Sequence, residues 1–220
     1  MWLHKLRKFI TSLLYPSRCP YCGTFLKSGK TLCGSCEKEI KSEPIVRELE
    51  LFDDITLRAV SAFSYDGKVK DAICDFKFKN KLDYVEHFSR SIVNVLEKVN
   101  IDKNFDYICC VPMSKDHEKE RGYNQAKVLA KSVSNILKIP FKDVLVKVKK
   151  TKTQHTLARD ERLINVKGAY IALNKEYVQK KKILLCDDIL TTGSTVKECA
   201  LALYNAGASD VLAICIANRD

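Results

Sequence analysis

One stretch of the sequence combines residue types that can hold a sugar phosphate. An apolar run over residues 183–186 leads into two carboxylates, Asp187 and Asp188. A loop of hydroxyl side chains around a glycine follows, and it consists of Thr191, Thr192, Gly193, Ser194 and Thr195. Backbone N–H groups at the start of a helix bind phosphate, and the hydroxyl groups add donors. The carboxylates would repel a bare phosphate, so they suit ribose hydroxyls or a Mg²⁺ ion beside them.

Two CxxC pairs form the second candidate site. They consist of Cys19, Cys22, Cys33 and Cys36. Four soft thiolates in two closely spaced pairs are the ligands that a tetrahedral Zn²⁺ requires. A disulfide or a redox-active pair is the alternative, although a redox CxxC usually occurs once and opens a helix. Four protein ligands leave no open position on the metal, so we expect a structural zinc.

Basic residues suggest an anionic partner. Thirty-eight Lys and Arg against 27 Asp and Glu give a net charge of +11, which can also serve solubility alone. Two groups of lysines, one of them beside Phe76, Phe78 and Tyr84, would form a candidate track for single-stranded DNA through charge and base stacking. These lysines are Lys77, Lys79, Lys147, Lys149, Lys150 and Lys152. A solvated lysine face over core aromatics is the alternative.

Hydrophobic periodicity predicts the elements that carry these residues. Apolar spacing predicts a short helix over 2–15, helical structure over 68–99 with an interruption near Asn80, and a helix over 124–137. Strands are expected over 57–65, 107–111 and 144–148, whereas residues 37–50 are a polar connection. No segment approaches the roughly 18 apolar residues that a membrane span needs.

The carboxyl-terminal part has the clearest pattern. A strand over 182–186, a turn over 187–194, a helix over 195–205 and a strand over 211–217 form a βαβ unit. Such a unit predicts a parallel sheet with ligands at the carboxyl ends of its strands. We therefore expect an α/β domain with a parallel sheet of about five strands over residues 51–220, preceded by a zinc module over residues 1–50.

The run CDDILTTGST, residues 186–195, resembles the signature of type I phosphoribosyltransferases, which bind phosphoribosyl pyrophosphate (PRPP). This resemblance implies that Asp187 and Asp188 contact the ribose hydroxyls and that residues 191–195 surround the 5-phosphate, with Mg²⁺ bound alongside PRPP. It also implies a pyrophosphate-binding loop after the strand over 107–111. The candidates in that loop are Ser114, Lys115 and Arg121.

Further motifs resemble the ComF family of competence-associated, phosphoribosyltransferase-like proteins. They are DFKFKN at 75–80, ERGYNQA at 120–126, and NVKGA at 165–169, together with the four-cysteine module. Cys186 and Asn80 depart from the family pattern, where an aliphatic residue and a glycine are more frequent. The resemblance implies cytoplasmic work on incoming single-stranded DNA, beside a helicase-like ATPase and a recombination mediator.

Two functions remain open at this point, and a metal-stabilised scaffold that has lost ligand binding is a third possibility, against which the intact acid pair and hydroxyl-rich loop argue. The first is a PRPP- or nucleotide-binding protein that helps to handle single-stranded DNA during transformation. The alternative is an active phosphoribosyltransferase of nucleotide metabolism, which would transfer phosphoribosyl from PRPP to a nitrogen acceptor. The sequence shows no recognisable pattern for binding an acceptor base, and this absence favours the first function.

Overall fold

The computed structural model describes residues 17–52, 55–99, 101, 104–148 and 168–219. Within these residues the chain forms a central five-stranded sheet in the order β1-β2-β7-β6-β3. Its strands are β1 (Ile45–Phe52), β2 (Ile55–Ser64), β3 (Tyr107–Cys110), β6 (Lys182–Leu190) and β7 (Asp210–Asn218). β2, β7, β6 and β3 pair in parallel, whereas β1 pairs with β2 in the antiparallel direction. The predicted α/β fold with a mainly parallel sheet is therefore confirmed.

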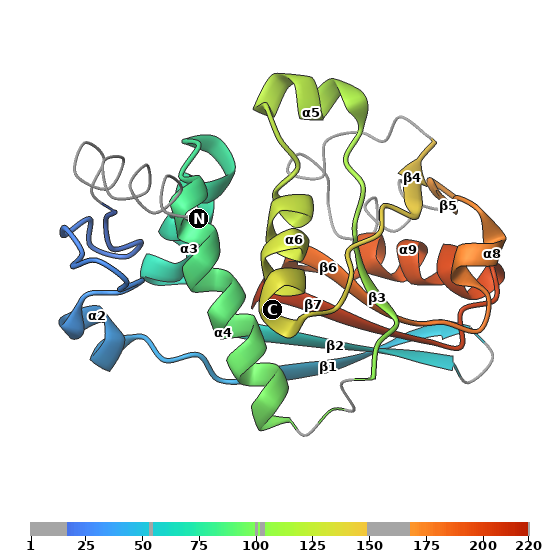
Figure 1. Ribbon diagram of the computed structural model, residues 1–220, viewed down its shortest axis with the longest axis horizontal. Helices are drawn as coiled ribbons and strands as arrows, with labels where there is room; N and C mark the ends of the chain where they lie inside the picture. Colours follow the sequence, from blue (N-terminus) through green and yellow to red (C-terminus); the bar gives the residue numbers. More distant parts are fainter. Residues whose placement is uncertain (1–16, 53–54, 100, 102–103, 149–167, 220) are drawn as a thin grey trace, which may run out of the picture.

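Helices and a small second sheet cover the two faces of the central sheet (Figure 1). One face packs against α3 (Gly67–Phe78), α4 (Val85–Lys98) and α6 (Gln125–Leu137). The other packs against α9 (Ser194–Asn205), α8 (Lys175–Val178) and the two-stranded sheet of β4 (Leu145–Lys147) and β5 (Tyr170–Ala172). Alternate residues of each central strand enter opposite cores, as Leu184 and Leu185 of β6 do, because successive side chains of a strand point to opposite faces.

The remaining helices are short. α2 (Gly34–Glu39) lies in the cysteine module, η1 (Leu82–Tyr84) links α3 to α4, and α5 (Lys115–Arg121) follows β3. The interruption predicted near Asn80 is confirmed, since Asn80 has a φ of 54° and separates α3 from η1. Left-handed backbone of this kind ends a helix and favours Asn or Gly.

Three sequence predictions differ from the structure. Residues 37–50 are not only a connection, because β1 begins at Ile45; as an edge strand it keeps polar residues such as Glu48 and Glu50 on its exposed face. β6 continues through Asp187 and Asp188 to Leu190, so the predicted turn begins later. The strand predicted over 144–148 exists as β4, but it pairs with β5 outside the central sheet. The helix predicted over 2–15 lies outside the described residues.

Candidate functional site

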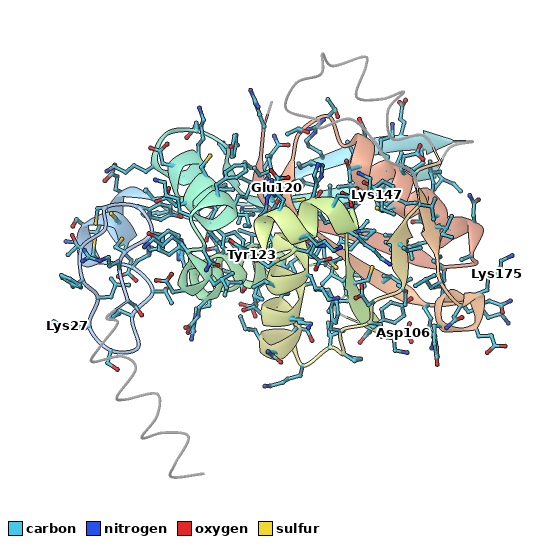
Figure 2. All side chains as sticks on the ribbon, turned by 90° about the horizontal axis from the view of Figure 1, so that it is seen from above. Lys27, Asp106, Glu120, Tyr123, Lys147 and Lys175 are labelled. Carbon is cyan, nitrogen blue, oxygen red and sulfur yellow. The ribbon has the colours of Figure 1, made fainter. Side chains whose placement is uncertain are left out.

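A cleft of about 550 Å³ lies at the carboxyl ends of β3 and β6. Its lining combines residues 111–114 after β3, residues 187–191 at the end of β6, and residues 193–196 at the start of α9. Glu120 of α5 and Lys147 of β4, both labelled in Figure 2, also line it. The carboxyl ends of parallel strands are where open α/β sheets bind ligands, so the position agrees with the βαβ pattern.

Asp187 and Asp188 both line this cleft, and a buried lysine accompanies them. Lys77 Nζ lies 2.8 Å from Asp188 Oδ1, and the side chains of Lys77 and Asp188 are only 9% and 15% exposed. The backbone N–H of Asp188 donates to Asp187 Oδ1 at 2.8 Å. Burial, and after it the charge of Asp188, raises the pKa of Asp187 to about 7. Sugar hydroxyls or a cation at Asp187 would favour its charged form.

The hydroxyl-rich loop forms a tight turn between β6 and α9. Gly193 has a φ of 77°, and α9 begins at the next residue. The positive φ favours glycine, and a Cβ atom at this position would lie 2.8 Å from Leu49 Cδ1 of β1, so that the end of the Leu49 side chain would have to move. The hydroxyl oxygens of Thr192 and Ser194 lie 2.6 Å apart. Thr191, Ser194 and Thr195 line the cleft, whereas Thr192 is not among the lining residues. The loop therefore presents the N-terminus of a helix and three residues with hydroxyl groups to the cleft, which is the arrangement expected for phosphate.

Arg47 of β1 supports this loop and was not predicted. Its Nη1 donates to the Thr191 carbonyl at 2.8 Å and to Asn218 Oδ1 at 3.0 Å. One guanidinium thus joins the loop to the end of β7. Its partner on the loop is 144 residues further along the chain, and no local pattern in the sequence could have indicated the contact.

The three residues expected at a pyrophosphate loop have different environments. Ser114 lines the cleft, and its hydroxyl accepts from the His117 backbone N–H at 3.3 Å, which caps α5. Arg121 also lines the cleft, with its guanidinium carbon 4.8 Å from the centre of the Phe78 ring. Lys115 is exposed and is not among the residues that line the cleft. Ser114 and Arg121 can therefore reach a ligand in the cleft as the structure stands.

The candidate lysine track is divided in the structure. Lys77 is buried against Asp188, so it belongs to the acid pair and not to an exposed track. Lys79 is exposed and pairs with Asp75 at 2.8 Å, whereas Lys147 lines the cleft 5.7 Å from the centre of the Tyr170 ring. Lys149, Lys150 and Lys152 lie outside the described residues. Of the aromatic residues suggested for base stacking, Phe76 and Tyr84 are buried and only Phe78 is exposed.

The four cysteines form one cluster. Their sulfur atoms all lie within 4.8 Å of one another, and Cys22 Sγ and Cys33 Sγ are 3.5 Å apart. That separation is too long for a disulfide, about 2.05 Å, and close to the roughly 3.8 Å edge of a tetrahedron with Zn–S bonds of about 2.3 Å. The backbone N–H of Cys36, and then the Ser35 hydroxyl, lower the pKa of Cys33 to about 6. The cluster fits a closed, structural zinc site.

The cysteine cluster is also part of the main hydrophobic core. Tyr21, which lies between the first two cysteines, packs edge-on against Phe63 of β2 and His87 of α4. Its hydroxyl group and His87 Nε2 are 2.8 Å apart in a buried hydrogen bond. The zinc module is therefore anchored to the α/β body by a shared core. Among the described residues, no helix is both long and apolar enough to cross a membrane.

Two family models match the chain. Residues 124–220 match the phosphoribosyl transferase domain, and residues 10–48 match the double zinc ribbon domain. The first match contains the acid pair and the hydroxyl-rich loop, and the second contains all four cysteines. The molecule thus joins a phosphoribosyltransferase-type α/β domain to a zinc ribbon, and structural zinc is the cofactor that the cysteines support.

Similar proteins match over most of the chain. Competence protein F of Haemophilus influenzae is 29% identical over 214 residues, covering 88% of this chain and 93% of the relative. Competence protein ComFC of Bacillus subtilis is 28% identical over 190 residues, covering 86% and 72%. DNA utilization protein YhgH of Escherichia coli is 28% identical over 206 residues, covering 90% and 88%. Over most of its length the chain is therefore similar to competence proteins of the ComF type, in agreement with the resemblance of its motifs.

Proposed function

We propose that this chain binds PRPP or a nucleotide in the cleft and helps to handle single-stranded DNA in the cytoplasm during natural transformation. The observation that carries the proposal is that the acid pair, Asp187 and Asp188, and the hydroxyl-rich loop that turns at Gly193 line one cleft at the end of β6. Asp187 and Asp188 would contact the ribose hydroxyls, with Mg²⁺ bound between ligand and protein. Residues 191–195 would hold the 5-phosphate, and Ser114 and Arg121 would face the pyrophosphate.

The DNA part of the proposal rests on different support. Two of the relatives are named competence proteins and a third is named a DNA utilization protein. The net charge of +11 provides the attraction that single-stranded nucleic acid requires. A helicase-like ATPase and a recombination mediator are the partners expected from the family resemblance.

Calorimetric titration with Mg-PRPP and with a single-stranded oligodeoxynucleotide tests both parts. The variant Asp187→Asn/Asp188→Asn keeps the side-chain shapes but removes the two charges. It should weaken PRPP binding on the order of 100-fold, because charge-assisted hydrogen bonds to the sugar are lost. Glu176→Gln/Asp210→Asn removes the same charge from exposed positions outside the cleft and is the matched control. PRPP affinity equal in both double variants would show that the site is assigned wrongly.

The oligonucleotide arm has its own criterion. Its affinity should fall as the salt concentration rises, because lysine and arginine contacts release counterions from the phosphates. An affinity that does not change with salt would contradict electrostatic DNA binding while leaving the PRPP result intact.

A transferase reaction is the second candidate, and the exposed Phe78 ring at the cleft favours it because an acceptor base could stack there. Release of pyrophosphate from Mg-PRPP on addition of a nitrogenous base would support this reaction. The chain's own contribution would be to orient the ribose and to stabilise the charge that develops on the leaving pyrophosphate.

A further inference from the structure

The side chain of Phe78 is far more exposed than the side chains of the two residues before it. Phe78 is 60% exposed, whereas Phe76 is fully buried and Lys77 is 8% exposed. The ring lines the same cleft as the acid pair and the hydroxyl-rich loop. An exposed aromatic side chain gives the cleft an apolar surface of a size that suits a planar ligand group.

The segment that carries Phe78 is fixed by the residues around the start of α6. The Tyr123 hydroxyl donates to the Phe76 carbonyl, and Gln125 Nε2 donates to the Lys77 carbonyl at 3.1 Å. Figure 2 labels Tyr123, which enters this contact from the α5–α6 connection. Two side chains therefore hold consecutive backbone carbonyls just before the ring, and the ring is positioned before any ligand arrives.

Arg121 extends the surface that Phe78 offers. Its guanidinium lies over the Phe78 ring at 4.8 Å, and its Nη1 donates to Gln125 Oε1 at 3.1 Å. Arginine planes and aromatic rings are the two surfaces on which proteins stack nucleobases. Gln125 thus holds both the backbone before Phe78 and the guanidinium above it, so the pair is built as a unit.

The pair is adjacent to the proposed ribose site. Lys77, the residue before Phe78, forms the 2.8 Å ion pair with Asp188. Phe78 lines the same cleft as both carboxylates, and the residue before it holds Asp188 directly. A nucleoside 5′-phosphate has the same order of groups, with a base, a ribose and a phosphate in sequence.

We propose that Phe78, with Arg121, is the stacking platform for the nucleobase of a nucleoside 5′-phosphate. Its ribose would lie at Asp187 and Asp188, and its phosphate at the loop of residues 191–195. This inference rests on the proposed function and deepens it, because it names a base-bearing ligand for the cleft. It also changes the role of Arg121 from a phosphate contact to part of a base-binding surface.

Paired titrations with ribose 5-phosphate and AMP, both with Mg²⁺, test the platform because the two ligands differ by the base. Stacking contributes about 1–3 kcal/mol per base, so AMP should bind the native chain roughly 5- to 150-fold more tightly. Phe78→Ala should remove most of this difference and leave ribose 5-phosphate affinity unchanged. Phe78→Trp should retain it.

A matched control is available on the zinc module. Phe25 is 57% exposed beneath Arg18, whose guanidinium carbon lies 3.9 Å from the ring centre, and neither residue lines the cleft. Phe25→Ala should leave both affinities unchanged.

Equal binding of AMP and ribose 5-phosphate by the native chain would overturn the platform and leave the sugar-phosphate site standing. An equal loss of both ligands in Phe78→Ala would also overturn it. If the native chain bound neither ribose 5-phosphate nor PRPP, the proposed function would fail, and the platform with it.

Discussion

The cysteine cluster and the cleft are assembled over very different lengths of chain. All four cysteines come from residues 19–36, and their sulfur atoms lie within 4.8 Å of one another. The cleft draws its lining from positions between Tyr65 and Arg219, on strands and helices from both halves of the chain. The cysteine cluster therefore depends on local turns and a metal ion, whereas the cleft depends on the central sheet and on long-range polar contacts.

The two regions nevertheless share a core. Cys19, Tyr21 and Cys36 are buried in the same hydrophobic cluster as α3, α4 and α6. A locally specified module has thus become part of the body that supports the cleft. We expect changes in the zinc module to destabilise the α/β domain more than changes at the cleft do.

Removal of zinc is expected to have the largest effect. A structural zinc site supplies roughly 10 kcal/mol or more to the fold around it, and here that fold includes buried Cys36. Chelation, or Cys36→Ser, should lower the unfolding temperature of the α/β domain as well as release the metal. Differential scanning calorimetry with zinc analysis measures both. Cys74→Ser, outside the quartet, should keep one zinc per chain. An unchanged unfolding temperature after complete zinc removal would mean that the shared core does not couple the regions.

Loss of Asp188 comes second. Asp188→Ala leaves the ammonium of Lys77 buried without its partner, and breaking a buried pair costs about 3–5 kcal/mol. The double variant Lys77→Met/Asp188→Leu replaces the pair with apolar groups, so it should regain most of the unfolding free energy while still failing to bind PRPP. Denaturant unfolding and calorimetry separate the two results. A fully stable Asp188→Ala variant would show that water already reaches Lys77.

The pH dependence of stability probes the shared core through His87. Burial lowers the pKa of His87 to about 4, below the usual value near 6.5. Between these values the unfolded chain binds a proton that the folded chain does not, so His87 lowers stability as the pH falls from about 6.5 to about 4. The full difference is about 3 kcal/mol.

The test compares the native chain with His87→Gln, which cannot titrate but still offers Tyr21 a polar partner. Asp187 has a raised pKa and acts in the opposite direction, since its contribution is lost as the pH rises toward about 7. The difference between the two proteins isolates His87, because Asp187 is present in both. Parallel stability curves between pH 4 and 6.5 would contradict a neutral, buried His87.

Local patterns predicted much of the fold and one complete site. The cysteine spacing, the βαβ unit after residue 182 and the interruption at Asn80 depend on neighbouring residues, so the sequence contains their signals. β1 was missed because an edge strand with Glu48 and Glu50 on its exposed face has little apolar character. Lys77 had the sequence appearance of a surface lysine. Its burial depends on the acid pair more than 100 residues later and on the Gln125 contact to its backbone.

Arg47 was missed because it lies on the unpredicted strand β1 and because its partners are far along the chain. Its substitution should have the smallest effect of the changes predicted for this protein. Arg47→Lys keeps the charge but replaces the planar Nη1 amino group, which donates to both the Thr191 carbonyl and Asn218, with an ammonium on a shorter side chain. The unfolding free energy should fall by only about 1 kcal/mol, because one of the two hydrogen bonds of Arg47 is lost and water can replace it. Mg-PRPP affinity should fall about tenfold, since roughly 1.4 kcal/mol would then be needed to order the loop around phosphate.

The control is Arg58→Lys on β2, which changes an exposed arginine paired with Glu48 and should alter neither the unfolding free energy nor the Mg-PRPP affinity. If Arg47→Lys bound PRPP as tightly as the native chain, the phosphate loop would set its own conformation, and the cleft would be more local than its long-range contacts indicate.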